Sequence, residues 1–206
     1  MVARAQLVCA HRVCAHLVSV NVVHGLRRGP TRVTAIDKRP VDGPVEVGPL
    51  GIDGDVQCDK RFHGGPDKAL YAFAGEESDG WAKELDRGIP PGYFGENLTT
   101  RGLDVDGALI GERWQIGDIE AGIVVEVRLP RDPCGNLSGW VGIPRFHRTF
   151  HQHGRPGAYL AVLRPGVIRA GDPITVVHRP DHDVTVSDCS QGRVRDPASL
   201  LTRAGS

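Results

Sequence analysis

Glycine and proline interrupt this chain so often that long runs of regular structure cannot form. The 206 residues include 27 glycines and 15 prolines, and both residue types favour turns. Between them lie short segments rich in β-branched residues, which favour strands. We predict strands at residues 17–23, 31–36, 45–47, 97–100, 119–127, 158–163 and 174–177, and an apolar segment at 68–74 that suits a strand or the start of a helix.

Helical patterns are fewer than strand patterns. Residues 76–85 suit a short helix, because Trp81 and Leu85 are four residues apart and Gly88 follows as a stop signal. A second helix is predicted over 143–153, and a short one over 197–203. Strands are spread along the whole chain and do not alternate with helices. The predicted fold class is therefore α+β, mainly β, with a β-barrel-like body and a few helices.

Length and charge narrow the classes of function. We expect an extension without fixed structure over 1–15, one domain over 16–186 and a polar tail over 187–206. Lys plus Arg and Asp plus Glu both number 25, so no general attraction to nucleic acid or anionic membranes is expected. Five cysteines, without a C-x-x-C pair, argue against a disulfide framework and favour a reducing, cytoplasmic setting.

The segment after the predicted strand 119–127 carries the most reactive side chain. Pro130 and Pro133 cannot donate hydrogen bonds to a sheet, so the strand must end here, and they stiffen the loop before Cys134. A helix over 135–141 would place Cys134 at a helix N-terminus, which favours thiolate, and Arg131 adds a positive charge. The residues alone leave open whether Cys134 is a reactive thiolate or a small buried apolar side chain, as free cysteine usually is.

Two other segments offer polar groups to a ligand. His63 precedes Gly64 and Gly65, whose backbone N–H groups can come close to an anion. Asn97 begins a predicted strand and its amide can both donate and accept hydrogen bonds. In both segments an ordinary tight turn is the alternative explanation.

Basic side chains gather at two further places. Lys38 and Arg39 follow a predicted strand and suit phosphate, although a solvated surface pair is the more common reason for such a doublet. His147, His151 and His153 invite a zinc interpretation, because the first two are four residues apart on a predicted helix. No third ligand of a usual kind is evident, so a metal role for these histidines is disfavoured.

Seven short phrases, taken in order, resemble the MOSC family, named for the C-terminal domain of molybdenum-cofactor sulfurases. The resemblance is strongest to its stand-alone branch, which is linked to resistance to hydroxylaminopurine, and it runs from about residue 16 to 186. The phrases are Ser19-Val20-Asn21, Lys38-Arg39-Pro40-Val41, Gly51-Ile52-Asp53-Gly54-Asp55, His63-Gly64-Gly65-Pro66-Asp67-Lys68-Ala69, Phe94-Gly95-Glu96-Asn97-Leu98, Pro130-Arg131-Asp132-Pro133-Cys134 and Gly157-Ala158-Tyr159-Leu160.

This resemblance implies a β-barrel-rich fold with a pocket for a molybdopterin-type cofactor. The family cysteine, here Cys134, would ligate molybdenum or carry sulfur as a persulfide, with Arg131 beside it as the second catalytic residue. Asn97 would hydrogen-bond the pterin or a metal oxo group. Cations and backbone N–H groups would hold the cofactor phosphate, and the candidates are Lys38, Arg39, His63, Gly64, Gly65 and Arg131.

The resemblance also implies an activity. Reductase members of the family remove oxygen from N-hydroxylated compounds, and a separate reductase would supply the electrons. The alternatives are a carrier that delivers persulfide sulfur or the cofactor to another enzyme, and a small-molecule-binding domain without catalysis. The chain departs from the closest branch at Asn136, where a lysine is common. It is too short to include the pyridoxal-phosphate domain of the full sulfurase, so that cofactor is not expected.

Overall fold

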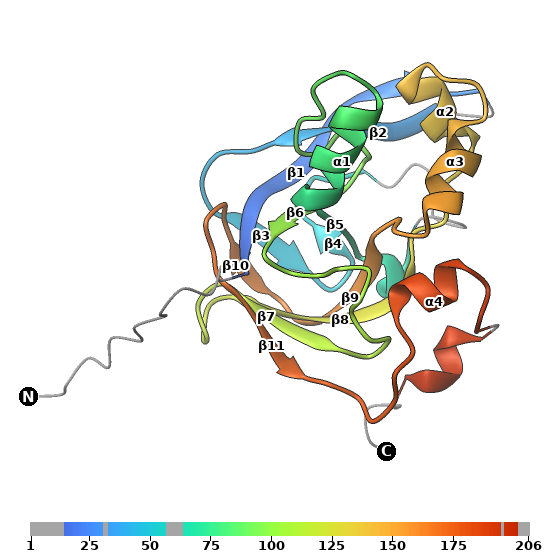
Figure 1. Cartoon of the computed structure of the whole chain (residues 1–206). Coiled ribbons are helices and arrows are strands. Elements are labelled where there is room, and N and C mark those ends of the chain that lie inside the picture. Colours follow the sequence, from blue (N-terminus) through green and yellow to red (C-terminus); the bar gives the residue numbers. More distant parts are fainter. Residues whose placement is uncertain (1–14, 31–32, 57–63, 195, 202–206) are drawn as a thin grey trace, which may run out of the picture.

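The computed structural model describes residues 15–30, 33–56, 64–194 and 196–201. Within them the chain forms eleven strands, four α-helices and two short 3-10 helices (Figure 1). The strands are β1 (His16–Arg28), β2 (Val33–Pro40), β3 (Val45–Gly48), β4 (Gly51–Ile52), β5 (Leu70–Ala74), β6 (Leu98–Arg101), β7 (Arg113–Ile116), β8 (Ile123–Pro130), β9 (Ala158–Arg164), β10 (Gly166–Ile168) and β11 (Ile174–His178). The helices are α1 (Gly75–Glu84), α2 (Gly135–Val141), α3 (Phe146–His153) and α4 (Val186–Ser190), with the 3-10 helices η1 (Pro66–Lys68) and η2 (Pro197–Leu200).

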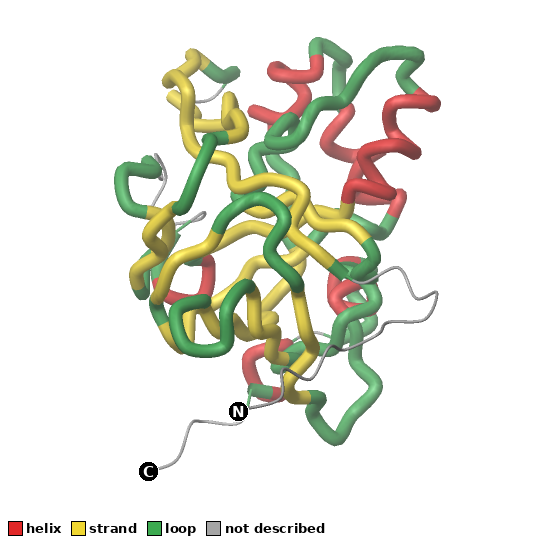
Figure 2. The backbone as a smooth tube through the Cα atoms, turned by 90° about the vertical axis from the view of Figure 1, so that its left-hand side faces the viewer, coloured by secondary structure: helices red, strands yellow, loops and turns green. Residues whose placement is uncertain are grey.

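One large, strongly curled sheet forms the body of the molecule. Its eight strands are ordered β11-β7-β8-β9-β5-β6-β1-β2, and a second sheet is ordered β10-β3-β4. The large sheet is not closed into a barrel, but its curl brings the start of β1 to the start of β11. There the Leu17 N–H donates to the Asp172 carbonyl over 2.9 Å, and the Gly171 N–H donates to the Leu17 carbonyl over 2.7 Å. The mainly β fold class, barrel-like with few helices, is confirmed (Figure 2).

The two faces of the curled sheet carry different cores. Along β5, Leu70, Ala72 and Ala74 face the inner, mainly aliphatic cluster, whereas Tyr71 and Phe73 face an aromatic one. This alternation follows from the period of two in a strand. Helices α1 and α3 cover the aromatic side (Figure 1).

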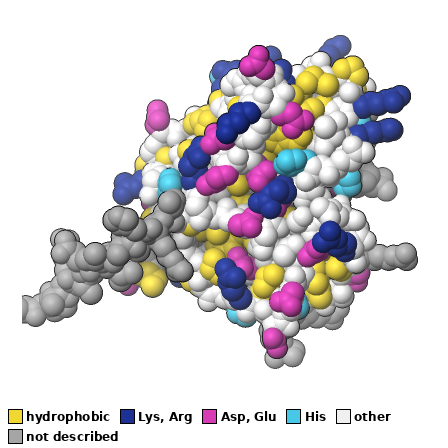
Figure 3. Space-filling view, viewed as in Figure 1, with side chains coloured by type: hydrophobic (Ala, Val, Ile, Leu, Met, Phe, Trp, Pro, Cys, Tyr) yellow, Lys and Arg dark blue, Asp and Glu magenta, His cyan; other side chains and the backbone are white. Residues whose placement is uncertain are grey.

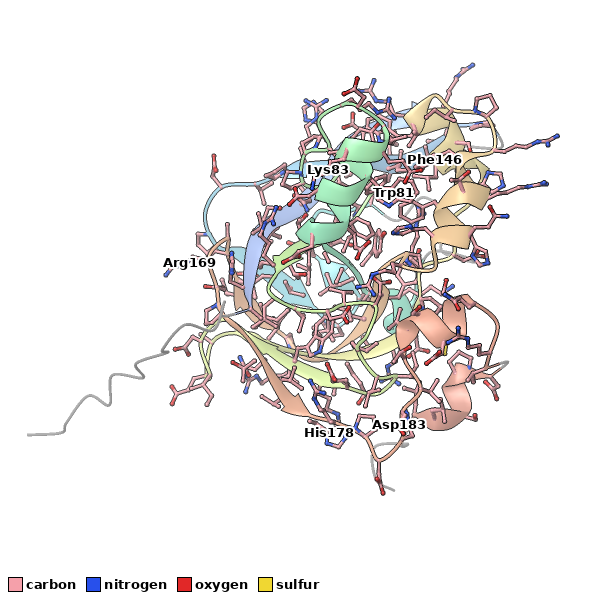
Figure 4. The ribbon with its side chains drawn as sticks, viewed as in Figure 1. Trp81, Lys83, Phe146, Arg169, His178 and Asp183 are labelled. Atoms are coloured by element: carbon pink, nitrogen blue, oxygen red, sulfur yellow. The ribbon has the colours of Figure 1, made fainter. Side chains whose placement is uncertain are left out.

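Aromatic rings from the helices complete this outer core. Figure 4 shows Trp81 of α1 and Phe146 of α3 pointing toward one another, and their ring centroids are 5.1 Å apart. Phe150 of α3 stacks on Trp81 with centroids 5.4 Å apart and also contacts Phe94. The result is a layer of aromatic faces between the sheet and the helices.

Most predicted elements are present, but several bounds were wrong. The strand predicted at 119–127 begins only at Ile123, because Asp118 accepts hydrogen bonds from the N–H groups of Glu120 and Ala121 and holds a turn there. Four elements were not predicted from the sequence: the strands β7, β4 and β10, which have two to four residues each, and the five-residue helix α4. Such segments are too short to show a clear period.

No helix within the described residues is long and apolar enough to cross a membrane. On the face seen in Figure 3, acidic and basic side chains are interspersed with hydrophobic ones, in keeping with the equal numbers of acidic and basic residues.

Candidate functional site

The loop between β8 and α2 carries the cysteine singled out from the sequence. The last strand residue, Pro130, pairs with Ala158 of β9, and the next N–H, from Arg131, donates to the Gly157 carbonyl over 3.0 Å. Cys134 then takes an extended conformation, with φ −112° and ψ 175°, and caps the N-terminus of α2. Residues 135–141 are helical, so the condition set out for Cys134 is met: it lies at a helix N-terminus, where it is partly exposed.

Cys134 lines a pocket whose walls come from several strands and loops that are distant in the sequence. The pocket joins Lys38 of β2, Arg131 and Cys134, three of the residues predicted to form the site. Aromatic and aliphatic side chains supply much of the remaining wall. The described residues that line it are Val33, Thr34, Ala35, Ile36, Lys38, Val56, Tyr71, Phe94, Gly95, Arg131, Cys134, Asn136 and Tyr159.

Arg131 is the most unusual residue of this pocket, because its charge is buried against aromatic faces. Only 7% of the residue is exposed. Its guanidinium lies 5.6 Å from the ring centroid of Tyr71 and 5.5 Å from that of Phe150. The Nη1 group is buried and has no hydrogen-bond partner among the described residues. A buried, incompletely satisfied cation is costly unless an anion or another acceptor meets it.

Two tyrosines face this cation from neighbouring strands. Tyr71 of β5 pairs in register with Tyr159 of β9, and their rings are 5.7 Å apart. Burial raises the pKa of Tyr159 to about 12 against the opposing charge of Arg131, and it raises the pKa of Tyr71 as well. The Tyr71 hydroxyl donates to the Pro156 carbonyl over 2.8 Å. Both hydroxyls stay neutral near pH 7 and can act as hydrogen-bond donors.

A buried polar network lies beside the pocket and includes two of the predicted residues, Lys38 and Asn97. The Lys38 ammonium pairs with the Asp55 carboxylate, and both side chains are nearly buried. The same carboxylate accepts from the Asn97 amide over 2.8 Å and from the Val23 N–H over 2.9 Å. The Lys38 charge is thus already balanced by Asp55.

Asn97 is occupied on both ends of its amide. Its Nδ2 group donates to Asp55 and to the Asn21 carbonyl, and its Oδ1 atom accepts from the Tyr71 N–H over 3.2 Å. Asn97 therefore ties β6 to β1 and β5 beside the pocket, and it is absent from the pocket lining.

Other predicted residues lie elsewhere. Arg39 is 54% exposed and pairs with Asp37, away from the pocket lining. Gly65, with φ +94°, precedes η1 and lines a different hollow beside β3, β4 and β10. Gly64 is partly buried. His63 is outside the described residues, so its predicted role stays a prediction.

Two of the three histidines named in the zinc interpretation contact separate partners. The His147 Nδ1 atom lies 2.8 Å from the Ser138 hydroxyl, and the His153 Nε2 atom lies 3.1 Å from a Glu77 oxygen. Within the described ranges no group of three His, Cys, Asp or Glu side chains could hold a metal ion.

Sequence reasoning missed several residues that build the site. No role was predicted for Asp55, although an aspartate next to a glycine, here Gly54, can serve as a buried acceptor as well as a turn residue. Tyr71 and Tyr159 occupy strand positions that read as ordinary core. Phe150 lies on α3, and nothing in its neighbourhood along the chain indicates that it meets Arg131.

Comparisons with known proteins match this chain over most of its length. The family model described as MOSC domain matches residues 59–175. Protein YiiM of Escherichia coli is 34% identical over 161 residues, covering 76% of this chain and 69% of that protein. A protein of Gibberella moniliformis named Reductase is 32% identical over 71% of this chain, which corresponds to only 26% of its own length. The crystal structure of YiiM from Geobacillus stearothermophilus has a TM-score of 0.70 and 31% identity, covering 86% of this chain and 82% of that one.

Proposed function

Because the chain belongs to the MOSC domain family, we propose that its pocket binds a molybdenum cofactor of the molybdopterin type, with Cys134 as the protein ligand of the metal. The observation that carries the proposal is Arg131, a buried guanidinium whose Nη1 group has no partner among the described residues and which lines the same pocket as the Cys134 thiol. A cation and a soft sulfur donor in one pocket suit a ligand with an anionic tail and a soft, redox-active metal.

The residues of the pocket fit such a cofactor. Arg131 is the cation best placed for the cofactor phosphate, because the Lys38 charge is balanced by Asp55. The guanidinium plane can donate to a phosphate through two parallel N–H groups. Asn97 acts as a positioning residue, since both hydrogens of its amide are already donated.

We propose a role for the Tyr159 hydroxyl and for the prolines of the Cys134 loop as well. Tyr159, whose pKa burial raises to about 12, keeps its proton at neutral pH and can orient a bound ligand without adding negative charge near the thiolate. The loop prolines, of which Pro133 is buried, hold the Cys134 sulfur in place before any ligand enters. Such preorganisation lowers the free-energy cost of binding.

The proposed activity is the reduction of N-hydroxylated bases or related compounds. When bound, the cofactor supplies reversible two-electron redox chemistry. The overall reaction consumes two electrons and two protons, breaks the N–O bond and releases the amine and water. We propose that a separate reductase supplies the electrons. The relative from Gibberella moniliformis supports this assignment, because a protein named Reductase contains a similar segment within a longer chain.

Replacement of Cys134 by serine tests the proposal, because serine keeps the size and removes the soft thiolate. Protein from a host that makes the cofactor should contain molybdenum and reduce an N-hydroxylated base with an artificial electron donor. The Cys134→Ser variant should fold normally and lose both properties. The control is Cys189→Ser, since Cys189 lies in α4 and packs against the inner core.

Two results would change the assignment. Retention of molybdenum and activity by Cys134→Ser would refute the role of the thiolate. A wild-type protein that carries a persulfide on Cys134 but no molybdenum would instead support the carrier function that the sequence left open.

A further inference from the structure

A second hollow continues the Cys134 pocket along β2. It shares Thr34, Ile36 and Asn136 with that pocket, so the two lie end to end. Beyond these three residues, its walls come from the end of β1, from the two residues that follow it and from α2. They are formed by Arg27, Arg28, Gly29, Pro30, Gly139 and Trp140. Whatever fills the Cys134 pocket can therefore extend into, or meet a second molecule in, this outer groove.

The aromatic side of the groove is held in position. The Trp140 Nε1 group donates to the Tyr93 carbonyl over 2.7 Å, which fixes the indole on α2. A Cβ atom at Gly139 would lie 2.9 Å from Pro30 Cδ, so only glycine lets the proline come this close to α2. The groove thus offers apolar ring surfaces from two elements.

Two arginines, Arg27 and Arg28, also line the groove. Arg27 and Arg39 share one buried carboxylate, Asp37, and Arg27 donates to it through Nε over 3.0 Å and through Nη2 over 2.6 Å. Burial tends to raise the pKa of Asp37, but the two guanidinium groups outweigh it and hold this pKa below its ordinary value. One carboxylate balances the charge of only one of these two arginines, and Arg28 follows Arg27 in the sequence. The net charge of this group of side chains is therefore positive.

A pre-fixed arginine is well suited to an anion. Asp37 restrains the Arg27 side chain, while 52% of that side chain is still exposed. Arginine binds phosphate through paired N–H groups, and a nucleobase stacks well on an indole. A planar aromatic surface with arginines at its edge matches a base joined to a phosphate.

We propose that the outer groove binds a nucleoside phosphate, with its base against Trp140 and Pro30 and its phosphate at Arg27 and Arg28. The inference rests on the proposed function in that the Cys134 end is taken to hold the cofactor. The nucleoside phosphate could be the N-hydroxylated substrate itself, presented as a nucleotide, or the nucleotide half of a dinucleotide form of the cofactor.

Binding can be measured on the full chain without any cofactor. Trp140 is a suitable reporter, because Trp81 and Trp114 are buried, at 2% and 0% exposure. Adenosine monophosphate, adenosine and inorganic phosphate are each titrated by tryptophan fluorescence and calorimetry into protein from a host that makes no cofactor. We expect the nucleotide to bind at least ten times more tightly than either fragment. Equal binding of nucleotide and inorganic phosphate would overturn the proposal.

Variants of the lining residues locate the site. Trp140 is partly buried and packs against the aromatic core, so the fold of Trp140→Leu is checked by circular dichroism, and its binding is measured by calorimetry alone because it lacks the fluorescent reporter. Arg28→Gln should weaken nucleotide binding about tenfold and leave adenosine unchanged, whereas Trp140→Leu should weaken both about tenfold, in line with the cost of losing one stacked base. The matched control is Arg193→Gln, because Arg193 is an exposed arginine that pairs with Asp188 at the other end of the chain. If Arg28→Gln behaves like Arg193→Gln, the nucleotide binds elsewhere, for example at Arg131, and the proposal fails.

The source of the nucleotide is decided by what the loaded protein releases. One nucleotide per molybdenum after acid release identifies the cofactor as the source. Cofactor without nucleotide, together with binding of an N-hydroxylated nucleotide, identifies the substrate. Cys134→Ser should leave these titrations unchanged, so failure of the molybdenum assignment and failure of the nucleotide site are distinguishable.

Discussion

The two cores of this protein differ in chemistry and in what they support. The inner core, enclosed by the curled sheet, consists mainly of aliphatic side chains such as Leu17, Leu98 and Ile123. The outer core, between the sheet and the helices, is built largely from tyrosine, phenylalanine and tryptophan. Aliphatic chains fill space but offer nothing to a charge, whereas aromatic faces attract cations. The outer core can therefore hold the Arg131 guanidinium, and the inner core serves stability alone.

The largest expected effect on stability comes from the inner core. Leu98→Ala removes a fully buried side chain of β6 and should lower the free energy of unfolding by about 2–5 kcal/mol, as for other buried leucines. Molybdenum bound per folded molecule should not change. Chemical denaturation and metal analysis measure the two quantities, with the exposed Leu163→Ala as control. If Leu98→Ala bound less molybdenum per folded molecule than wild type, the inner core would also contribute to cofactor binding, and the two cores would not have separate roles.

The next largest effect on stability is expected from Asp106, a buried carboxylate linked through Gly157 to the Arg131 backbone. Its carboxylate accepts from the Gly157 N–H over 2.8 Å, and the Gly157 carbonyl accepts from the Arg131 N–H. Burial raises the pKa of Asp106 from 3.8 to about 7, helped by Glu77 and Asp104 and opposed by Gly157 and Arg155. Its unfolded form ionises at lower pH, so this group destabilises the fold progressively as pH rises from about 4 to about 7.

Asp106→Asn should remove this pH dependence. At about 1.4 kcal/mol for each pKa unit, the variant should exceed wild type by on the order of 4 kcal/mol at pH 8 and match it near pH 4. Urea denaturation at several pH values measures the difference. Asp118→Asn is the control with the opposite sign. Hydrogen bonds from the Ala121 and Glu120 N–H groups lower the Asp118 pKa. Replacing this carboxylate should therefore lower the free energy of unfolding at neutral pH. Parallel pH curves for wild type and Asp106→Asn would contradict the assignment.

A smaller stability effect with a functional consequence is expected from the outer core. Phe150→Leu keeps the site apolar and should cost about 1–3 kcal/mol. It also removes one of the two aromatic faces at Arg131, so molybdenum retention during dialysis should fall several-fold. Phe146→Leu is the matched control, because Phe146 packs in the same cluster against Trp81, whereas the rings at Arg131 are those of Tyr71 and Phe150. Equal molybdenum loss by both variants would mean that only packing matters.

The smallest stability effect is expected from Arg131 itself. Arg131→Met removes a buried cation whose Nη1 group lacks a partner among the described residues, so cofactor-free protein should stay within about 1 kcal/mol of wild type or gain stability. Molybdenum binding should be lost. Arg113→Met should instead lower stability, because Arg113 pairs with the buried Glu126 carboxylate over 2.7 Å. If the free energy of unfolding of Arg131→Met is much lower than that of Arg113→Met, Arg131 is a structural cation.

The sequence by itself determined the class of fold and the reactive loop. The β-branched and apolar segment 158–163 predicts a strand, whereas 68–74 was left open between a strand and the start of a helix. The prolines around Cys134 end β8 wherever the strand lies, since proline cannot donate to a sheet. These are local consequences of residue type, and the structure confirms the strand at 158–163 and the end of β8 at Pro130.

Only the tertiary structure decided how charges are balanced in the site. Lys38 and Arg39 are neighbours in sequence, yet Lys38 pairs with Asp55 beside the pocket, whereas the exposed Arg39 pairs with the buried Asp37 away from it. Arg131 meets Phe150 across nineteen positions of chain, and Asn97 bonds to Asp55 on a different element. Partners of this kind depend on which strands lie side by side, and the free energy of a buried charge depends on those partners rather than on its neighbours along the chain.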